Sequence, residues 1–226
     1  PCTEGVRWFV FKSPLAASPE QVASFGKLYP HNARPIQPAN GRTVLSLCFP
    51  MKKVYLGQET DGQLLRGQGF RDIRLLSEDS AFADISLVKT TSGQHGSDRT
   101  YAVPVMAERL GEACGVVFRH PQEKTLWLVG DTIWRPEIEA DMLRLRPDVV
   151  VLNAGYAHVI GFGPIIMGEQ DVLNVHFLLP QASIVAIHME AINHCLLTRS
   201  ALREYVEANQ VSDAVSIPQD GETVIF

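Results

Sequence analysis

Three apolar, strand-like segments of this chain each lead into a residue that can bind a cation. The segments and residues are 125–129 with Asp131, 85–89 with His95, and 184–187 with His188. Divalent cations such as zinc take imidazole and carboxylate ligands, commonly from segments far apart in sequence. Alone, each residue has an ordinary structural interpretation: a surface histidine, a turn aspartate or a core histidine. Together they predict a metal site at one edge of a sheet.

Other polar residues near these segments are candidates for the same site. We expect His194 to act in catalysis beside Asp131, although capping of a loop is an equal alternative. Asn153 follows a buried strand, and His158 lies in the Gly-rich loop beyond it, so both are expected to bind substrate, with a surface position the alternative for His158. Cys195 beside His194 offers a weaker hypothesis, a Cys/His nucleophile pair, but no acid partner is evident.

The elements that must position these residues follow from hydrophobic period and from turn and capping residues. A β-α-β run is predicted at 54–56, 60–69 and 73–76, and a hairpin around the polar turn 120–124. The remaining predicted elements are a buried strand at 149–152, helices at 136–146, 169–179 and 199–209, and a C-terminal hairpin at 215–217 and 223–226. The pattern predicts a layered α/β fold.

Composition limits the class of protein. The chain has 226 residues, 46% of them hydrophobic, which is enough for one sizeable core. A net charge of −5 argues against a nucleic-acid partner, and the lack of a long apolar run argues against a membrane span. The cysteines are expected to be free thiols in a reducing compartment, which predicts a cytoplasmic protein: Cys2, Cys48, Cys114 and Cys195. We expect a small-molecule substrate; the oligomeric state is not predicted.

The first fifty residues differ in character from the rest. Residues 1–58 carry a net charge of +5 and the remainder −10, and half of the 14 prolines lie in residues 1–50. We therefore expect an atypical N-terminal segment, 1–50, followed by one domain, 51–226.

Residues 51–226 resemble the metallo-β-lactamase fold superfamily. The segments that carry the resemblance keep the family order: 64–70, Gly93-Gln94-His95-Gly96, Leu128-Val129-Gly130-Asp131-Thr132, 187–195 and 218–222. The resemblance implies a four-layer αββα sandwich and a hydrolase in which one or two ions of zinc, manganese or iron activate water. It also implies that His95, Asp131 and His188 are ligands, with Asp131 bridging two metals, and it leaves the substrate open.

One family motif is missing. The H-x-H-x-D-H motif should precede residues 53–56, but residues 42–51 contain nothing like it, and His31 is the only histidine upstream. In the family layout neither ion would then have more than two protein ligands, whereas a catalytic zinc takes three. Translation out of the family's reading frame and genuine divergence are both open explanations. The alternative function is a catalytically inactive relative that binds a small molecule or a protein, and an imperfect gene product is a third hypothesis.

Overall fold

The computed structural model describes residues 53–226, apart from residues 68, 78, 79 and 191. The predicted N-terminal segment, 1–50, lies outside the described residues. Among those described, no helix has the length and apolarity needed to cross a bilayer.

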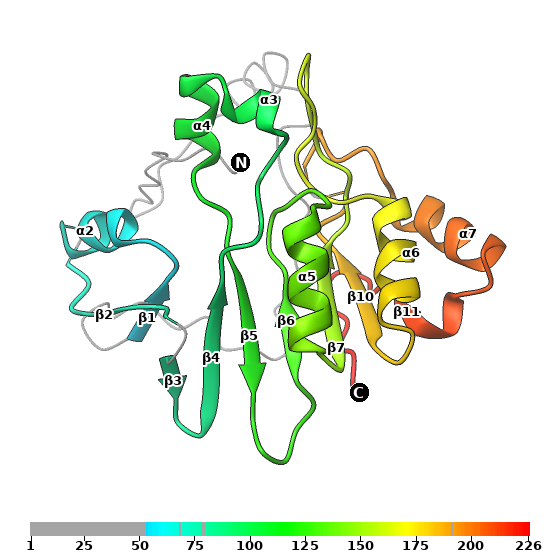
Figure 1. Ribbon diagram of the computed structural model, residues 1–226, viewed down its shortest axis with the longest axis horizontal. Helices are drawn as coiled ribbons and strands as arrows, with labels where there is room; N and C mark the ends of the chain where they lie inside the picture. Colours follow the sequence, from blue (N-terminus) through cyan, green and yellow to red (C-terminus); the bar gives the residue numbers. More distant parts are fainter. Residues whose placement is uncertain (1–52, 68, 78–79, 191) are drawn as a thin grey trace, which may run out of the picture. The chain divides into compact units, whose positions relative to one another are not determined.

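A seven-stranded mixed sheet forms the centre of the fold (Figure 1). Its spatial order is β11-β10-β7-β6-β5-β4-β3. The bounds are β3 Ser80–Phe82, β4 Ile85–Thr90, β5 Gly115–Arg119, β6 Leu126–Leu128, β7 Val149–Asn153, β10 Ser183–Ile187 and β11 Val215–Ser216. Strands β6, β7, β10 and β11 are parallel, whereas β3 to β6 alternate in direction. Strands β4, β6, β7 and β10 therefore all end at the same edge of the sheet.

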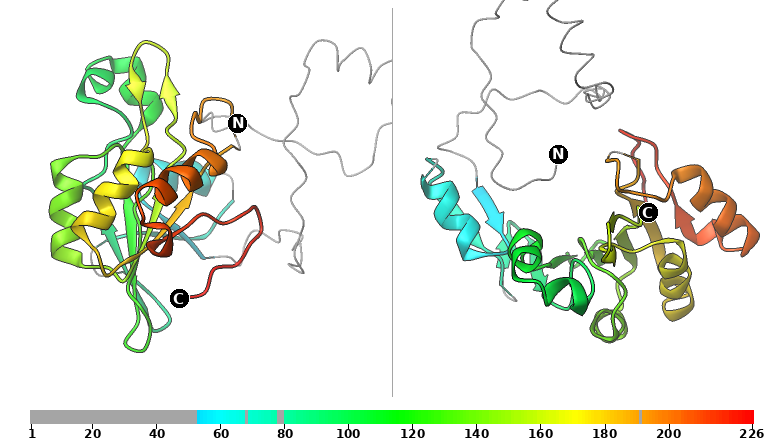
Figure 2. Two further views of the ribbon diagram at one scale, coloured as in Figure 1. Left: turned by 90° about the vertical axis from the view of Figure 1, so that its right-hand side faces the viewer. Right: turned by 90° about the horizontal axis from the view of Figure 1, so that it is seen from above.

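Helices cover one face of the parallel half of this sheet (Figure 2). Helices α5 (Pro136–Leu145) and α6 (Glu169–Leu178) lie on that face, and α7 (Arg199–Ala208) packs beside α6. Ile138 and Met142 of α5 are fully buried in the main apolar cluster, which also holds the core residues of β7 and β10. The three-and-four spacing that predicted α5 thus marks its buried face.

The predicted β-α-β run is present as a second, smaller sheet. Strands β1 (Lys53–Leu56) and β2 (Asp72–Leu75) pair in parallel and are joined by α2 (Glu59–Gly67). The mixed α/β class with a large sheet and flanking helices is confirmed. Within the described residues, the strands outside the large sheet are this pair and a second pair, residues 158–159 and 163–164.

The predicted hairpin around 120–124 is confirmed, because β5 and β6 pair in antiparallel register. The predicted C-terminal hairpin is wrong. Strand β11 pairs in parallel with β10, and residues 217–226 form no strand. Pro218 has no N–H for a ladder, and its carbonyl accepts instead from Arg199 Nε at 2.9 Å, which holds the chain against α7.

Several short elements were not predicted from the sequence, among them β3. Helices α3 (Asp98–Tyr101) and α4 (Pro104–Leu110) follow the His95 loop, and β8 (His158–Val159) pairs with β9 (Gly163–Pro164) in a small hairpin. A 3₁₀ turn, Ser212–Ala214, precedes β11. The signals for the two helices were available, since Ser97 caps α3 and Pro104 opens α4.

One hydrogen bond joins two buried side chains of the large sheet, and it leads to a prediction. The Nε1–H of Trp127, a fully buried residue, donates to Thr90 Oγ1 at 3.2 Å. Thr90→Val keeps the shape but leaves the indole N–H without its acceptor, so the free energy of unfolding should fall by about 1–3 kcal/mol. Urea unfolding measures the loss. Thr91→Val, at an exposed position, is the control, and an equal effect in both variants would contradict this account.

Candidate functional site

The predicted site residues lie where strands end at the shared edge of the large sheet. His95 follows β4, Asp131 follows β6, Asn153 ends β7, and His188 directly follows β10. The sequence-based expectation that separate strands deliver these groups to one edge agrees with the observed topology.

Asp131 lies in contact with two partners. Its Oδ1 accepts a hydrogen bond from Asn153 Nδ2 at 2.6 Å and lies 3.4 Å from His188 Nε2. The Asp131 side chain is 38% exposed and that of His188 24%, so both still face accessible space. The carboxylate is therefore oriented by an amide on one side and an imidazole on the other.

The position of His188 depends on tight backbone packing. His188 has a left-handed φ of +64°, and a Cβ placed on Gly155 would lie 2.1 Å from the His188 carbonyl oxygen. The backbone of Ala154 donates to Ile187 at 3.0 Å, and Cys195 Sγ donates weakly to the His188 carbonyl at 3.5 Å. The loop after β7 thus fixes the loop after β10.

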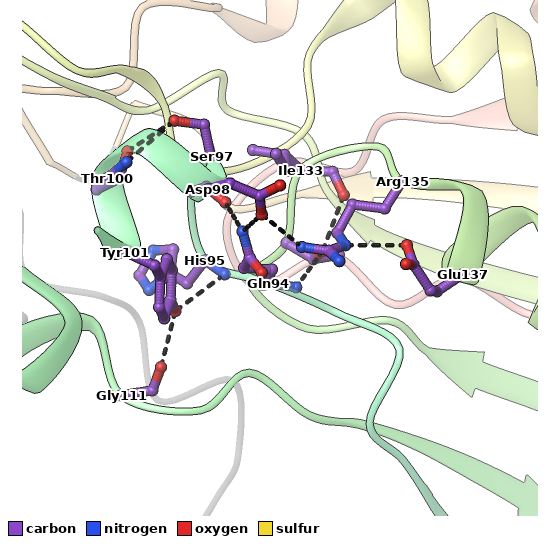
Figure 3. Close-up of polar contacts among 12 residues, drawn as sticks. Gln94, His95, Ser97, Asp98, Thr100, Tyr101, Gly111, Ile133, Arg135 and Glu137 are labelled. Carbon is purple, nitrogen blue, oxygen red and sulfur yellow. Dashed lines mark hydrogen bonds and ion pairs between the residues drawn. The ribbon is translucent and has the colours of Figure 1, made fainter. Parts of the chain in front are cut away.

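The His95 loop is tied directly to the Asp131 loop. The Gln94 N–H donates to Thr132 Oγ1 at 2.8 Å, and the Ile133 N–H donates back to the Gln94 carbonyl at 3.0 Å. Figure 3 shows Tyr101 beside His95, with its hydroxyl donating to the Gly111 carbonyl at 2.7 Å and accepting from the His95 N–H at 3.3 Å. Sequence analysis missed these positioning residues, although the Gln94-His95 and Asp131-Thr132 pairs stood beside predicted ligands.

His95 shares one electrostatic neighbourhood with the other candidates. Burial lowers the pKa of the His95 imidazole below its ordinary value, and the nearby charge of Asp131 opposes that shift. His188 and His194 lower the same pKa by charge repulsion, and a hydrogen bond to the Leu110 backbone raises it. A neutral imidazole is the form that binds a metal.

The candidate ligands are of the right chemical types for a divalent metal, but too few of them are grouped together. Two imidazoles and a carboxylate suit zinc. Yet within the described part of the chain, no three or more His, Cys, Asp or Glu side chains are grouped so that they could hold an ion. The pair of Asp131 and His188 is formed, with His95 nearby. The described residues alone therefore fall short of the three ligands that a catalytic zinc takes.

The two predicted substrate-binding residues have different surroundings. Asn153 donates to Asp131 and so acts on a predicted ligand. His158 lies in β8, its backbone N–H donates to the His194 carbonyl at 3.0 Å, and its ring meets Tyr156 edge-on at 4.4 Å. The β8–β9 hairpin therefore carries His158 and holds it beside the His194 segment.

One curated relative shares sequence with this chain, and two relatives of known structure share both sequence and fold. UPF0173 protein YddR of Bacillus subtilis is 35% identical over 174 residues, 77% of this chain and 66% of YddR. The isothiocyanate hydrolase from Delia radicum gut bacteria is 47% identical with a TM-score of 0.73, covering 76% of this chain and 66% of that one. A possible metal-dependent hydrolase from Veillonella parvula is 39% identical over the same shares, also with a TM-score of 0.73. The chain thus spans just under two thirds of these relatives. No family model matches it.

A second group of relatives matches a much shorter stretch. The carbonic anhydrase of Nostoc sp. is 51% identical over 45 residues, 20% of this chain and 17% of that protein. The carbonic anhydrase of Pectobacterium carotovorum is 50% identical over 46 residues, 20% of this chain and 19% of that protein. Likeness over less than a fifth of those proteins shows only that a segment is shared.

The fold itself is shared more widely. The metallo-β-lactamase fold protein YhfI from Bacillus subtilis is only 11% identical but has a TM-score of 0.51 over 75% of this chain and 62% of that one. The sheet topology, the ordered motifs and the two hydrolase structures agree with that likeness. This chain therefore has the metallo-β-lactamase fold.

Proposed function

We propose that this protein descends from, and acts as, a metal-dependent hydrolase of small electrophilic substrates. The observation that carries the proposal is the contact of Asp131 with His188 and Asn153 at the sheet edge, with His95 in the same electrostatic neighbourhood. The relatives named as hydrolases, at 47% and 39% identity, support the same reaction class.

The roles follow from the donor chemistry of each side chain. We propose that His95, Asp131 and His188 hold the metal after His95 moves toward the Asp131–His188 pair, because these three side chains are not grouped around one ion in this structure. Zinc is preferred to manganese or iron because two of the three donors are imidazoles. A bound metal lowers the pKa of water and so supplies a nucleophile near neutral pH. Asn153 fixes the Asp131 carboxylate through its 2.6 Å hydrogen bond. We propose that His194 exchanges a proton with the substrate and that His158 lines the space that binds it.

An isothiocyanate is the first substrate to test, because a 47% identical relative is named for that activity. Water adds its oxygen to the central carbon of R–N=C=S, the C–N bond breaks, and both protons of water end on nitrogen. The products are an amine, R–NH₂, and carbonyl sulfide.

Activity of the full chain tests the proposal. We expect zinc-supplemented protein to release 2-phenylethylamine from 2-phenylethyl isothiocyanate faster than buffer with the same zinc, and a chelator to abolish the difference. Amine release is followed by chromatography. If isothiocyanates and a panel of esters, lactones and phosphodiesters all react at the buffer rate, the chain is an inactive relative and the proposal fails.

Asn153 gives a second, independent prediction. Asn153→Ala removes the amide that orients Asp131, and the loss of a group that orients a ligand typically weakens metal binding by about 10–100-fold. Competition with a chromophoric zinc chelator measures the change. Asn209→Ala is the matched control, since its amide donates to the Tyr205 carbonyl on a surface helix. Unchanged zinc affinity in Asn153→Ala would show that this contact has no part in metal binding.

A further inference from the structure

A cavity opens beside the β8–β9 hairpin, next to the site just described. Its volume is about 1000 Å³, within the range of small-molecule sites. Two segments line it: the hairpin with its loop, and the chain that follows His188. They are joined by the His158–His194 backbone hydrogen bond and by a bridge between Ala157 and Cys195. The two walls of the cavity are thus held together by backbone contacts.

Much of the lining is apolar, and part of it is unusually exposed. Ile160, in the loop of the hairpin, is 98% exposed, and Leu196, on the opposite segment, is 60% exposed. Ile165 is buried and belongs to a small apolar cluster of its own. A ligand that covers Ile160 and Leu196 would remove apolar surface from water, which stabilises the complex.

Two histidines belong to the lining of this cavity. The Nε2 atom of His158 is buried and has no hydrogen-bond partner among the described residues. A buried polar atom of this kind costs free energy unless a ligand or water satisfies it. His194 also lines the cavity, and its charge acts on His95, so the cavity reaches the neighbourhood of the predicted ligands.

We propose that this cavity binds the organic group of a neutral substrate. The substrate class is an electrophile with an apolar tail of about aryl-alkyl size, which packs on Ile160 and Leu196. Substrate choice then depends on the cavity, whereas the reaction depends on Asp131 and its partners. This inference rests on the proposed function.

The test measures binding, so it needs neither metal nor turnover. The probes are 2-phenylethylthiourea and methylthiourea, which share an unreactive thiocarbonyl group and differ in the apolar tail. By calorimetric titration, we expect the phenylethyl compound to bind at least about tenfold more tightly. Leu196→Asn should remove most of that preference, and Leu143→Asn, at a 48% exposed leucine of α5, should leave it unchanged.

Equal affinity for the two probes, or an equal effect of Leu196→Asn and Leu143→Asn, would overturn the cavity assignment. Preferential binding without any hydrolysis would instead count against the proposed function and leave the cavity in place.

A different observation carries a second inference, about the residues ahead of β1. The match to YddR covers 174 residues, which is the length of 53–226, and it leaves 52 of the 226 residues unmatched. The carbonic anhydrases match 45 or 46 residues of this chain at 51% and 50% identity. We infer that a carbonic-anhydrase-like segment precedes residue 53. A stretch that keeps such identity to a carbonic anhydrase is translated in the reading frame of that protein, so a random out-of-frame translation does not explain it. A segment of separate origin also agrees with the different net charge and proline content of the first fifty residues.

The strands β1 and β2 form a small sheet of their own. Among the described residues they form a two-stranded parallel sheet, and such a pair is marginal alone because parallel strands normally belong to larger, covered sheets. We infer that the unmatched third of the hydrolase relatives supplies further strands beside this pair.

An exchange of segments tests this inference. Replacing residues 1–52 with the segment that precedes the matched region in the isothiocyanate hydrolase should raise the thermal midpoint by about 5 °C or more. Replacement with the matching segment of the Nostoc carbonic anhydrase should leave it unchanged within about 1 °C. Equal shifts from the two exchanges, or no shift from the hydrolase segment, would contradict the inference.

Discussion

Gly155→Ala should be among the most damaging single substitutions in the described part of the chain. The added Cβ would lie 2.1 Å from the His188 carbonyl oxygen and 2.9 Å from Cys195 Sγ, and real Cβ atoms do not approach backbone oxygen so closely. Because the nearest obstacle is backbone, the His188 loop must move. We expect the free energy of unfolding to fall by about 3 kcal/mol.

The same substitution should disturb the site. His188 already has a left-handed backbone, so a shift of its carbonyl would move the imidazole away from Asp131. Chemical denaturation measures the loss of stability, and zinc competition measures the loss of the site. Gly62→Ala in helix α2 is the matched control, since its Cβ meets only the flexible end of Arg66 at 3.4 Å and alanine favours a helix. A variant of Gly155 as stable as the Gly62 variant would refute the proposed packing.

Asp131→Asn is expected to remove most of any hydrolytic activity. The neutral amide is nearly the same size, but it carries no negative charge for a cation or for His188, and it meets the Asn153 amide without an ionised acceptor. We expect the rate of amine release to fall at least about a hundredfold. Asp84→Asn is the control, because Asp84 also contacts a histidine, His120, at 3.1 Å, but on the surface.

Much of the fold follows from local sequence signals. Helix α7 begins as its cap predicts, since Thr198 Oγ1 accepts from the Ala201 N–H at 3.1 Å. The β5–β6 hairpin and helix α5 follow from turn residues and apolar spacing. The C-terminal hairpin failed because Arg199, far from it in sequence, holds Pro218. A tertiary contact of this kind leaves no local signal.

From the sequence, the site could be predicted only as far as the edge of the sheet at which its residues lie. The rule that parallel strands end at one edge predicts that the strands before His95, Asp131 and His188 end together, and the topology agrees. Of the three side chains, Asp131 and His188 are in contact. The contact between Asn153 and Asp131 depends on β6 and β7 being neighbours, with Leu128 paired to Val151. The expectation that Asn153 binds substrate could not anticipate that register. The proposed roles of His194 and His158 stay predictions.

The central claim is that His95, Asp131 and His188 bind one shared ion, and zinc binding at equilibrium tests it most directly. Full-length protein and the Asp131→Ala and Asp84→Ala variants are dialysed against buffered zinc and analysed for metal content. The account predicts about one zinc ion per chain in the wild type and in Asp84→Ala, and less than about a tenth in Asp131→Ala. Equal zinc in all three proteins, or none in the wild type, would contradict it.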